Sequence, residues 1–357
     1  MFCKEDFRTD QKAFGHFWNH EIVDRPIVCV TSPKRGMSIP ESNASYYNML
    51  NCCLNGDYDS LLANYERRID SIFFGGEALP YYEFAIGPDQ FAAFMGGELE
   101  TRPEMHTSWI KSFVKDFAEY TPRLDLSKGG YLEKVKKFYE YASFRAEGRY
   151  FIQMLDLHSN MDALSAARNP QELCFDLLDC PEQIERAMRE VRNLYAPVYE
   201  AVFKAGRMDK YGSIGWAPTY CDGKFAVVQC DFACMISNEL FRKFVLEAVR
   251  EEAAYLDRCV YHYDGKEALR HLDDILAIEE IDCIQWVPGD GQPRTVEWMD
   301  ILKKIQKAGK SVWIYDWTPD EIMCRFKELE PNKVLFSTHV STQDEAERLL
   351  EYLRRNT

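Results

Sequence analysis

Eight short apolar runs recur along the whole chain, and longer amphipathic stretches separate them. The runs are rich in Val, Ile, Phe, Trp and Tyr, which favour extended strands. Strands that are apolar along most of their length are typical of parallel sheets covered on both faces. The eight predicted strands are residues 26–31, 70–74, 150–155, 225–230, 259–261, 282–286, 311–315 and 334–337.

The stretches between the runs show the period of amphipathic helices. An Asp-Cys-Pro-Glu start signal opens one of them, and Gly309 stops another. Strands that alternate with helices in this number favour a (β/α)8 barrel, the TIM-barrel fold, over an open doubly wound sheet. The clearest predicted helices are residues 181–205, 238–256, 295–308 and 342–355.

We therefore expect one TIM-barrel domain over residues 1–357. Residues 1–24 are expected to form a helical segment that packs on the barrel, and the barrel itself to span about residues 25–357. Residues 206–223 are rich in glycine and aromatic residues, which predicts an inserted hairpin over the mouth of the barrel.

Composition narrows the class of protein. The 357 residues are 46% hydrophobic and carry 43 basic against 58 acidic side chains, a net charge of −15. Such an acidic chain is a poor binder of nucleic acid or of anionic membranes. Twelve scattered cysteines without a C-x-x-C pair indicate reduced thiols. With no secretory signal and no apolar run of membrane-span length, a cytoplasmic enzyme is expected.

Polar residues follow the predicted strands, where the reactive groups of a barrel enzyme lie. Taken one at a time, such residues more often cap the next helix or pair with a base. Aromatic residues at the same strand ends are expected to line the substrate-binding site. His158 and the basic turn after the first strand are expected to contact the substrate. The candidate substrate-binding residues are Lys34, Arg35, His158, Trp216, Trp286 and Trp317.

His262 and Asp264 form the most specific signal, because one residue separates them in a strand and they therefore point the same way. His339 ends the last strand and can reach the same mouth. Imidazole and carboxylate ligands suit zinc, which predicts His262, Asp264 and His339 as metal ligands. The same groups also suit acid–base catalysis, for which Asp231, Glu77 and Asp264 are the candidates.

Four sequence blocks together resemble the uroporphyrinogen decarboxylase superfamily, which includes the cobamide-dependent methyltransferases. The similarity covers roughly residues 25–352. It implies a TIM barrel with its site at the C-terminal mouth. The blocks are Asp231-x4-Ile236-Ser237-x-Glu239-Leu240-Phe241-x2-Phe244, Tyr261-His262-x-Asp264-Gly265-x3-Leu269, Gly309-Lys310, and Asn169-Pro170-x-Glu172-Leu173 through Asp179-x-Pro181-Glu182.

The resemblance implies two enzyme branches. Methyltransferases of the family hold zinc through a His-x-Cys pair on the fifth strand, and here Asp264 replaces that cysteine while His339 lies near the last ligand. Decarboxylases bind an acidic tetrapyrrole without metal. In that branch Lys34 and Arg35 stand where arginines bind the carboxylates, and Glu77 lies at the position of a catalytic aspartate.

We expect a methyltransferase that moves a methyl group between a small substrate or thiol and a corrinoid, with zinc in the site. The corrinoid would be carried by a partner protein, because the chain has no room for a binding domain of its own. The alternatives are a metal-free decarboxylase acting on a porphyrinogen or another acidic compound, and a barrel that only delivers or shields a cobamide. A homodimer is expected because such barrels commonly pair.

Overall fold

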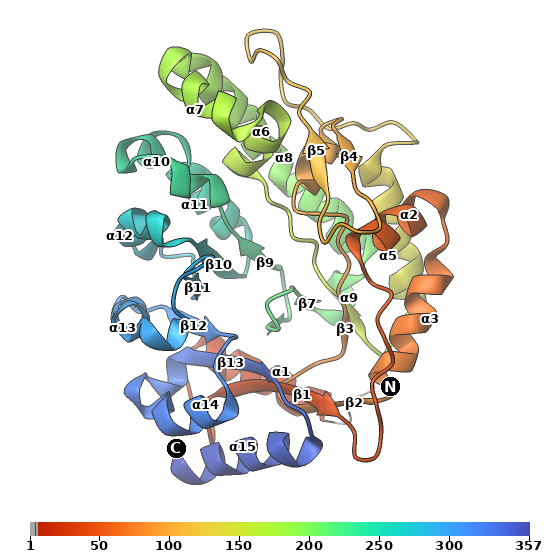
Figure 1. The fold of residues 1–357 in the computed structure, drawn as a ribbon, viewed down its shortest axis with the longest axis vertical. Coiled ribbons are helices and arrows are strands. Elements are labelled where there is room, and N and C mark those ends of the chain that lie inside the picture. Colours follow the sequence, from red (N-terminus) through yellow and green to blue (C-terminus); the bar gives the residue numbers. More distant parts are fainter. Residues whose placement is uncertain (1–3, 5) are drawn as a thin grey trace.

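The computed structural model describes Lys4 and residues 6–357. Seven strands form one curled sheet in the order β2-β1-β13-β12-β11-β10-β9 (Figure 1). All neighbouring strands in it are parallel except β1 and β2. Its strands are β1 (Ile27–Pro33), β2 (Ile72–Gly76), β9 (Phe225–Val228), β10 (Arg258–Asp264), β11 (Cys283–Val287), β12 (Ser311–Ile314) and β13 (Val334–His339).

A second pair of parallel strands, β3 (Tyr81–Tyr82) and β6 (Phe151–Ile152), lies beside the main sheet. The Met154 N–H continues this pair by donating to the Ile214 carbonyl in β7. Among the described residues, no strand pairing joins β3 to β1 or β2. The fold is therefore mixed α/β with a mostly parallel sheet, as predicted, whereas closure into a complete barrel is not confirmed.

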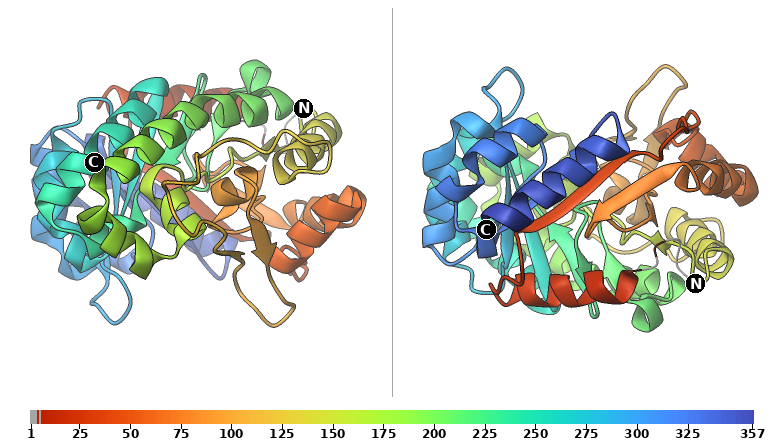
Figure 2. Two further views of the ribbon diagram at one scale, coloured as in Figure 1. Left: turned by 90° about the horizontal axis from the view of Figure 1, so that it is seen from above. Right: turned by 90° about the horizontal axis from the view of Figure 1, so that it is seen from below.

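Helices cover the outer face of the sheet, and α15 lies alongside β1 and β2 (Figure 2). Threonine capping boxes fix the starts of α14 and α15. The helices are α1 (Phe7–Trp18), α2 (Tyr46–Asn55), α3 (Tyr58–Ile69), α4 (Gln90–Phe94), α5 (Tyr131–Arg145), α6 (Asn160–Arg168), α7 (Pro170–Asp179), α8 (Pro181–Ala205), α9 (Met208–Tyr211), α10 (Asn238–Phe244), α11 (Leu246–Tyr255), α12 (Leu272–Leu276), α13 (Met299–Lys307), α14 (Pro319–Arg325) and α15 (Gln343–Asn356).

Each of the eight predicted runs contains a strand, but the second one runs in the opposite direction. The segment between β1 and β2 turns back through α2 and α3, so Gly76 at the end of β2 pairs with Cys29 near the start of β1. Gly76 has φ +59°, and a Cβ there would lie 2.1 Å from the Val28 carbonyl oxygen. The glycines before Glu77 therefore serve close strand contact and not a catalytic turn.

The inserted hairpin exists, but its place differs from the prediction. Its strands, β7 (Ser213–Ile214) and β8 (Tyr220–Cys221), pack on α1. The Trp18 indole N–H donates 2.8 Å to the Tyr220 carbonyl. Tyr220, Ile214 and Ala217 are buried with the apolar face of α1, so the hairpin fills the N-terminal end of the sheet and does not cover its mouth. Two further short strands, β4 (Glu98–Glu100) and β5 (Trp109–Lys111), form a separate antiparallel pair.

None of the helices in the described part of the chain has both the length and the apolar composition of a membrane span.

Glu77 belongs to a buried ion pair at the N-terminal end of β1. Its two carboxylate oxygens each lie 2.8 Å from an Arg25 guanidinium nitrogen, and one also accepts the Val28 N–H at 3.0 Å. The side chains of Arg25 and Glu77 are only 7% and 9% exposed, respectively. Because β2 is antiparallel, Glu77 lies at the opposite end of β1 from the strand ends that carry the other candidates, which corrects its assignment as a catalytic residue.

Glu77→Gln should lower the free energy of unfolding by about 3–5 kcal/mol, because it leaves the buried Arg25 cation unpaired. Chemical denaturation followed by circular dichroism measures the loss. The matched control is Arg35→Gln, which removes an exposed ion pair to Asp344 and Glu347 and should leave the unfolding midpoint almost unchanged. Equal effects of the two variants would contradict a structural role for Glu77.

Candidate functional site

Three side chains from two neighbouring strands converge at the C-terminal edge of the sheet. His262 and Asp264 lie in β10, and Asp231 lies three residues beyond the end of β9, at the start of a short 3-10 helix (Asp231–Met235). One ligand atom of each lies within 4.8 Å of the others. Parallel pairing of β9 and β10 brings these ends together. The structure thus groups two of the predicted metal ligands with a predicted catalytic carboxylate.

A hydrogen bond to Gln285 orients the His262 ring. The two residues are direct neighbours across β10 and β11, and Nδ1 of His262 lies 2.6 Å from Oε1 of Gln285. An amide oxygen only accepts, so Nδ1 donates in this bond, and a neutral ring in this orientation offers the lone pair of Nε2 to a metal. That is the form of histidine that binds a metal, and its second nitrogen is held by an outer partner as in known metal sites.

The two carboxylates of the site are incompletely satisfied. Among the described residues, Oδ1 of Asp231 and Oδ1 of Asp264 are buried atoms without a hydrogen-bond partner. Burial raises the pKa of Asp264, His262 lowers it, and the negative charge of Asp231 raises it further. Carboxylate oxygens that lack donors and lie close together favour a bound cation.

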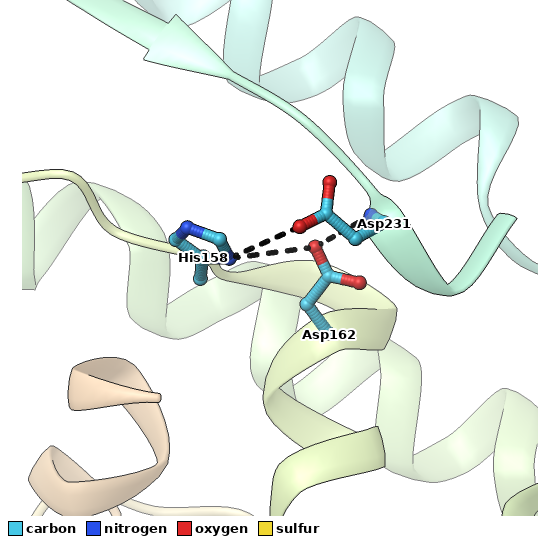
Figure 3. A group of neighbouring side chains, drawn as sticks. All are labelled: His158, Asp162 and Asp231. Atoms are coloured by element: carbon cyan, nitrogen blue, oxygen red, sulfur yellow. Dashed lines mark hydrogen bonds and ion pairs between the residues drawn. The ribbon is translucent and has the colours of Figure 1, made fainter. Parts of the chain in front are cut away.

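His158 lies on the other side of Asp231, close to Asp231 and Asp162 (Figure 3) and to a third carboxylate, Asp156. Its Nε2 is 3.1 Å from Asp156, and its Nδ1 is 4.0 Å from Asp162 and 3.9 Å from Asp231. Burial alone would lower the pKa of His158, but the carboxylates raise it to about 10. At neutral pH His158 is therefore an imidazolium that offsets their negative charge, which favours a charge partner over a metal ligand.

Asp162, in the first turn of α6, fixes the backbone of Asp231. Its two carboxylate oxygens accept the N–H groups of Asp231 and Phe232, each at 2.9 Å. Burial and the neighbouring Asp231 raise the pKa of Asp162 to about 7. The sequence analysis missed this residue. The four-residue spacing between His158 and Asp162 was the available signal, because it places them close together where a helix begins.

A cavity of about 960 Å³ lies between the ends of β12, β13 and β1 and the segment around β3. Asp231, His262 and Asp264 do not line it themselves, and Trp216 links it to His262. Trp216, on the loop of the inserted hairpin, lies in its wall, and its ring is 5.2 Å from the His262 ring. His339 also lines the cavity, with Nδ1 3.1 Å from the Thr31 hydroxyl. Among the described residues, no group of three neighbouring ligand atoms includes His339.

Two predicted wall residues face away from the site. Trp286 follows Gln285 in β11, so strand alternation turns it to the helix side, where it packs 5.4 Å from Trp298. Trp317 is buried against Phe336 at 5.7 Å and donates to Thr295. Trp313, in the middle of β12, is buried in the core and also lines the cavity.

The predicted substrate-binding cations are also engaged elsewhere. Lys34 donates to the Asp70 carbonyl at 2.8 Å, and Arg35 pairs with Asp344 and Glu347 of α15. Neither residue lines the cavity. The thiols of Cys230 and Cys283 are buried. Burial raises their pKa values, so they remain protonated and do not supply the thiolate that binds a metal.

No family model matches the chain, and no curated protein sequence matches it. Its fold is similar to the solved structure of a methyltransferase from Methanosarcina mazei. The two share 13% sequence identity with a TM-score of 0.60, and the match covers 97% of this chain and 98% of the other. The likeness is one of fold over the full length.

A buried carboxyl, Glu252 of α11, supports the loop that carries His158. Ser159 donates to it at 2.7 Å, and the Asn160 amide lies 3.3 and 3.1 Å from its two oxygens. Asn160 has a positive φ of 51°. This unfavourable backbone conformation is held by the bonds to Glu252 and to the Gln229 carbonyl. Burial raises the pKa of Glu252 to about 8, although the hydrogen bonds from Ser159 and Asn160 lower it in part.

Stability should fall as pH rises from about 5 to 8 because of Glu252. In that window the folded protein holds a proton that the unfolded chain, with an ordinary pKa near 4.3, has released, so the slope approaches −1.4 kcal/mol per pH unit at most. Glu252→Gln should remove this contribution in denaturant titrations at several pH values. Glu251→Gln, an exposed neighbour, should keep the wild-type slope. Equal slopes for wild type and Glu252→Gln would contradict the raised pKa.

Proposed function

We propose that the protein is a metal-dependent methyltransferase that moves a methyl group between a small substrate or thiol and a corrinoid carried by a partner protein. The observation that carries the proposal is the convergence of Asp231, His262 and Asp264 beside the large cavity. The full-length similarity in fold to a methyltransferase supports the reaction class. The nature of the ligands supports the metal.

The donor set fits zinc. Zinc accepts imidazole nitrogen and carboxylate oxygen, and a catalytic site keeps one position open for water or substrate. His262 presents Nε2, while Asp231 and Asp264 each have an oxygen without a donor. The Asp231 side chain is 46% exposed, which leaves the site open at the mouth. His339, predicted as a third ligand, is better placed to contact a substrate in the cavity.

When bound, zinc would supply a Lewis acid that lowers the pKa of a substrate thiol or water at neutral pH. The protein's own groups prepare the site for it. Gln285 orients the ring of His262, and Asp162 fixes the backbone of Asp231. The ring of Trp216 packs edge-on against His262 and excludes water from that side.

A metal-free decarboxylase is less well supported. That reaction needs cations that hold an acidic substrate, and Lys34 and Arg35 are engaged outside the cavity. Glu77, its candidate catalytic acid, is held in the ion pair with Arg25.

Elemental analysis of the purified protein should find about one zinc per chain, and His262→Ala should lose it. His339→Ala should retain the metal, because His339 lies outside the ligand group. Gln285→Leu should weaken metal affinity by about 10–100-fold, since it removes the outer partner of His262. Competition with a chromogenic chelator measures the affinities.

The metal-loaded protein should then change the absorption spectrum of methylcobalamin in the presence of a thiol, and His262→Ala should not. Wild-type protein without metal, both as purified and after zinc is added, would contradict the proposal and favour the decarboxylase.

A further inference from the structure

The cavity beside the metal ligands has an aromatic wall built from three elements. Trp216 packs 5.4 Å from Trp313 of β12, and Trp313 packs 6.0 Å from Tyr315. Tyr81 of β3 joins this wall, and its hydroxyl donates to the Trp216 carbonyl at 3.4 Å. All four side chains line the cavity. Stacked and edge-on rings around one space present several electron-rich faces to whatever occupies it.

A single unpaired carboxylate lies in the same wall. Glu83 is two residues beyond Tyr81 in an extended segment, so both side chains point the same way, and both line the cavity. In the described part of the chain, Glu83 has no hydrogen-bond or ion-pair partner. The Glu83 side chain is exposed within the open cavity. A carboxylate that faces the cavity beside aromatic rings offers an ion pair to a positively charged ligand.

Among the described residues, none of the basic side chains that line the cavity, Arg68, His106 and His339, pairs with Glu83. Arg68 lines the cavity, but its guanidinium donates to the Pro40 carbonyl. His339 bonds to Thr31. The pKa values of Tyr46 and of Tyr81 are raised mainly by burial. The negative charge of Glu83 raises both of them further.

We propose that the cavity binds a methylated ammonium cation, with the cationic head between the aromatic wall and Glu83. Aromatic faces attract quaternary ammonium groups, and the attraction grows when water is excluded. A methylated ammonium group makes no hydrogen bond through its methyls. It therefore suits a site in which ring faces and one carboxylate supply the recognition, and in which the cavity's 960 Å³ leaves room for the rest of the molecule.

The role of this cation as methyl donor rests on the proposed function, whereas its binding does not. Transfer of CH3⁺ to the nucleophilic corrinoid breaks one C–N bond, forms one bond from carbon to the acceptor and leaves the electron pair on the amine nitrogen. The product is a neutral amine. It has lost the permanent charge and one of the methyl groups that the site recognises, which favours its release.

Isothermal titration calorimetry with choline and with 3,3-dimethylbutan-1-ol tests the inference on wild-type protein. The two molecules have the same shape, and only choline is charged. Choline should bind about tenfold or more tightly than the alcohol, in keeping with desolvated cation–π and charge contacts. Equal binding of the two, or no binding of choline, would overturn the inference.

Variants locate the site. Glu83→Gln should weaken choline binding about tenfold without changing the affinity for the alcohol, and Trp313→Leu should weaken choline binding as well. Glu98→Gln, which removes an exposed carboxylate on β4 outside the cavity, should leave choline binding unchanged. Thermal unfolding confirms that each variant is folded. An unchanged dissociation constant in Glu83→Gln would place choline elsewhere and contradict the inference.

The titrations are done with metal removed by chelator, so the two proposals fail separately. Choline binding without any zinc affinity would leave this inference standing and overturn the metal-dependent function. Zinc binding at His262 without choline binding would overturn this inference and leave the metal-dependent function standing.

Discussion

Parallel pairing of β9, β10 and β11 is the constraint on which the site depends. It places the ends of three strands at one edge and makes His262 a direct neighbour of Gln285. The period of two within each strand then decides which side chains face inward. Because His262, Asp264 and Gln285 share the inner face, the imidazole, a carboxylate and the orienting amide meet without any special loop. Asp231 joins them from the start of the 3-10 helix that begins three residues after β9.

Negative charge is the second organising feature of this edge. Asp156, Asp162, Asp231 and Asp264 lie along this edge, and in the described part of the chain the imidazolium of His158 lies among the first three. Around His158, that cation and two backbone N–H groups offset much of the negative charge, although Oδ1 of Asp156 has no donor. Around His262, Oδ1 of Asp231 and Oδ1 of Asp264 also lack donors. Because a cation already lies in the first group, the second is the one that we propose for the metal.

Much of the fold could be predicted from the sequence, because long apolar strands between amphipathic helices leave few alternatives. The direction of β2 could not be predicted, since it depends on the path of the chain through α2 and α3. That path places Glu77 at the N-terminal end of β1, away from the site. Alternation correctly pairs His262 with Asp264. The same rule, applied from Gln285, would have turned Trp286 outward. Asp162 could have been found only through its four-residue spacing from His158, because it lies in a helix and not at a predicted strand end. Glu83 lies in an irregular segment, and no sequence pattern points to it.

The loop that carries Trp216 reaches the cavity from the N-terminal end of the sheet, where α1 holds the hairpin through Trp18 and Tyr220. The floor of the cavity is therefore built separately from its rim. Strand ends supply the reactive groups, while an insertion anchored on the opposite side sets the depth and chemical character of the space beneath them. A protein built this way is able to change what it accommodates by altering the hairpin and α1 together, while the reactive edge stays as it is.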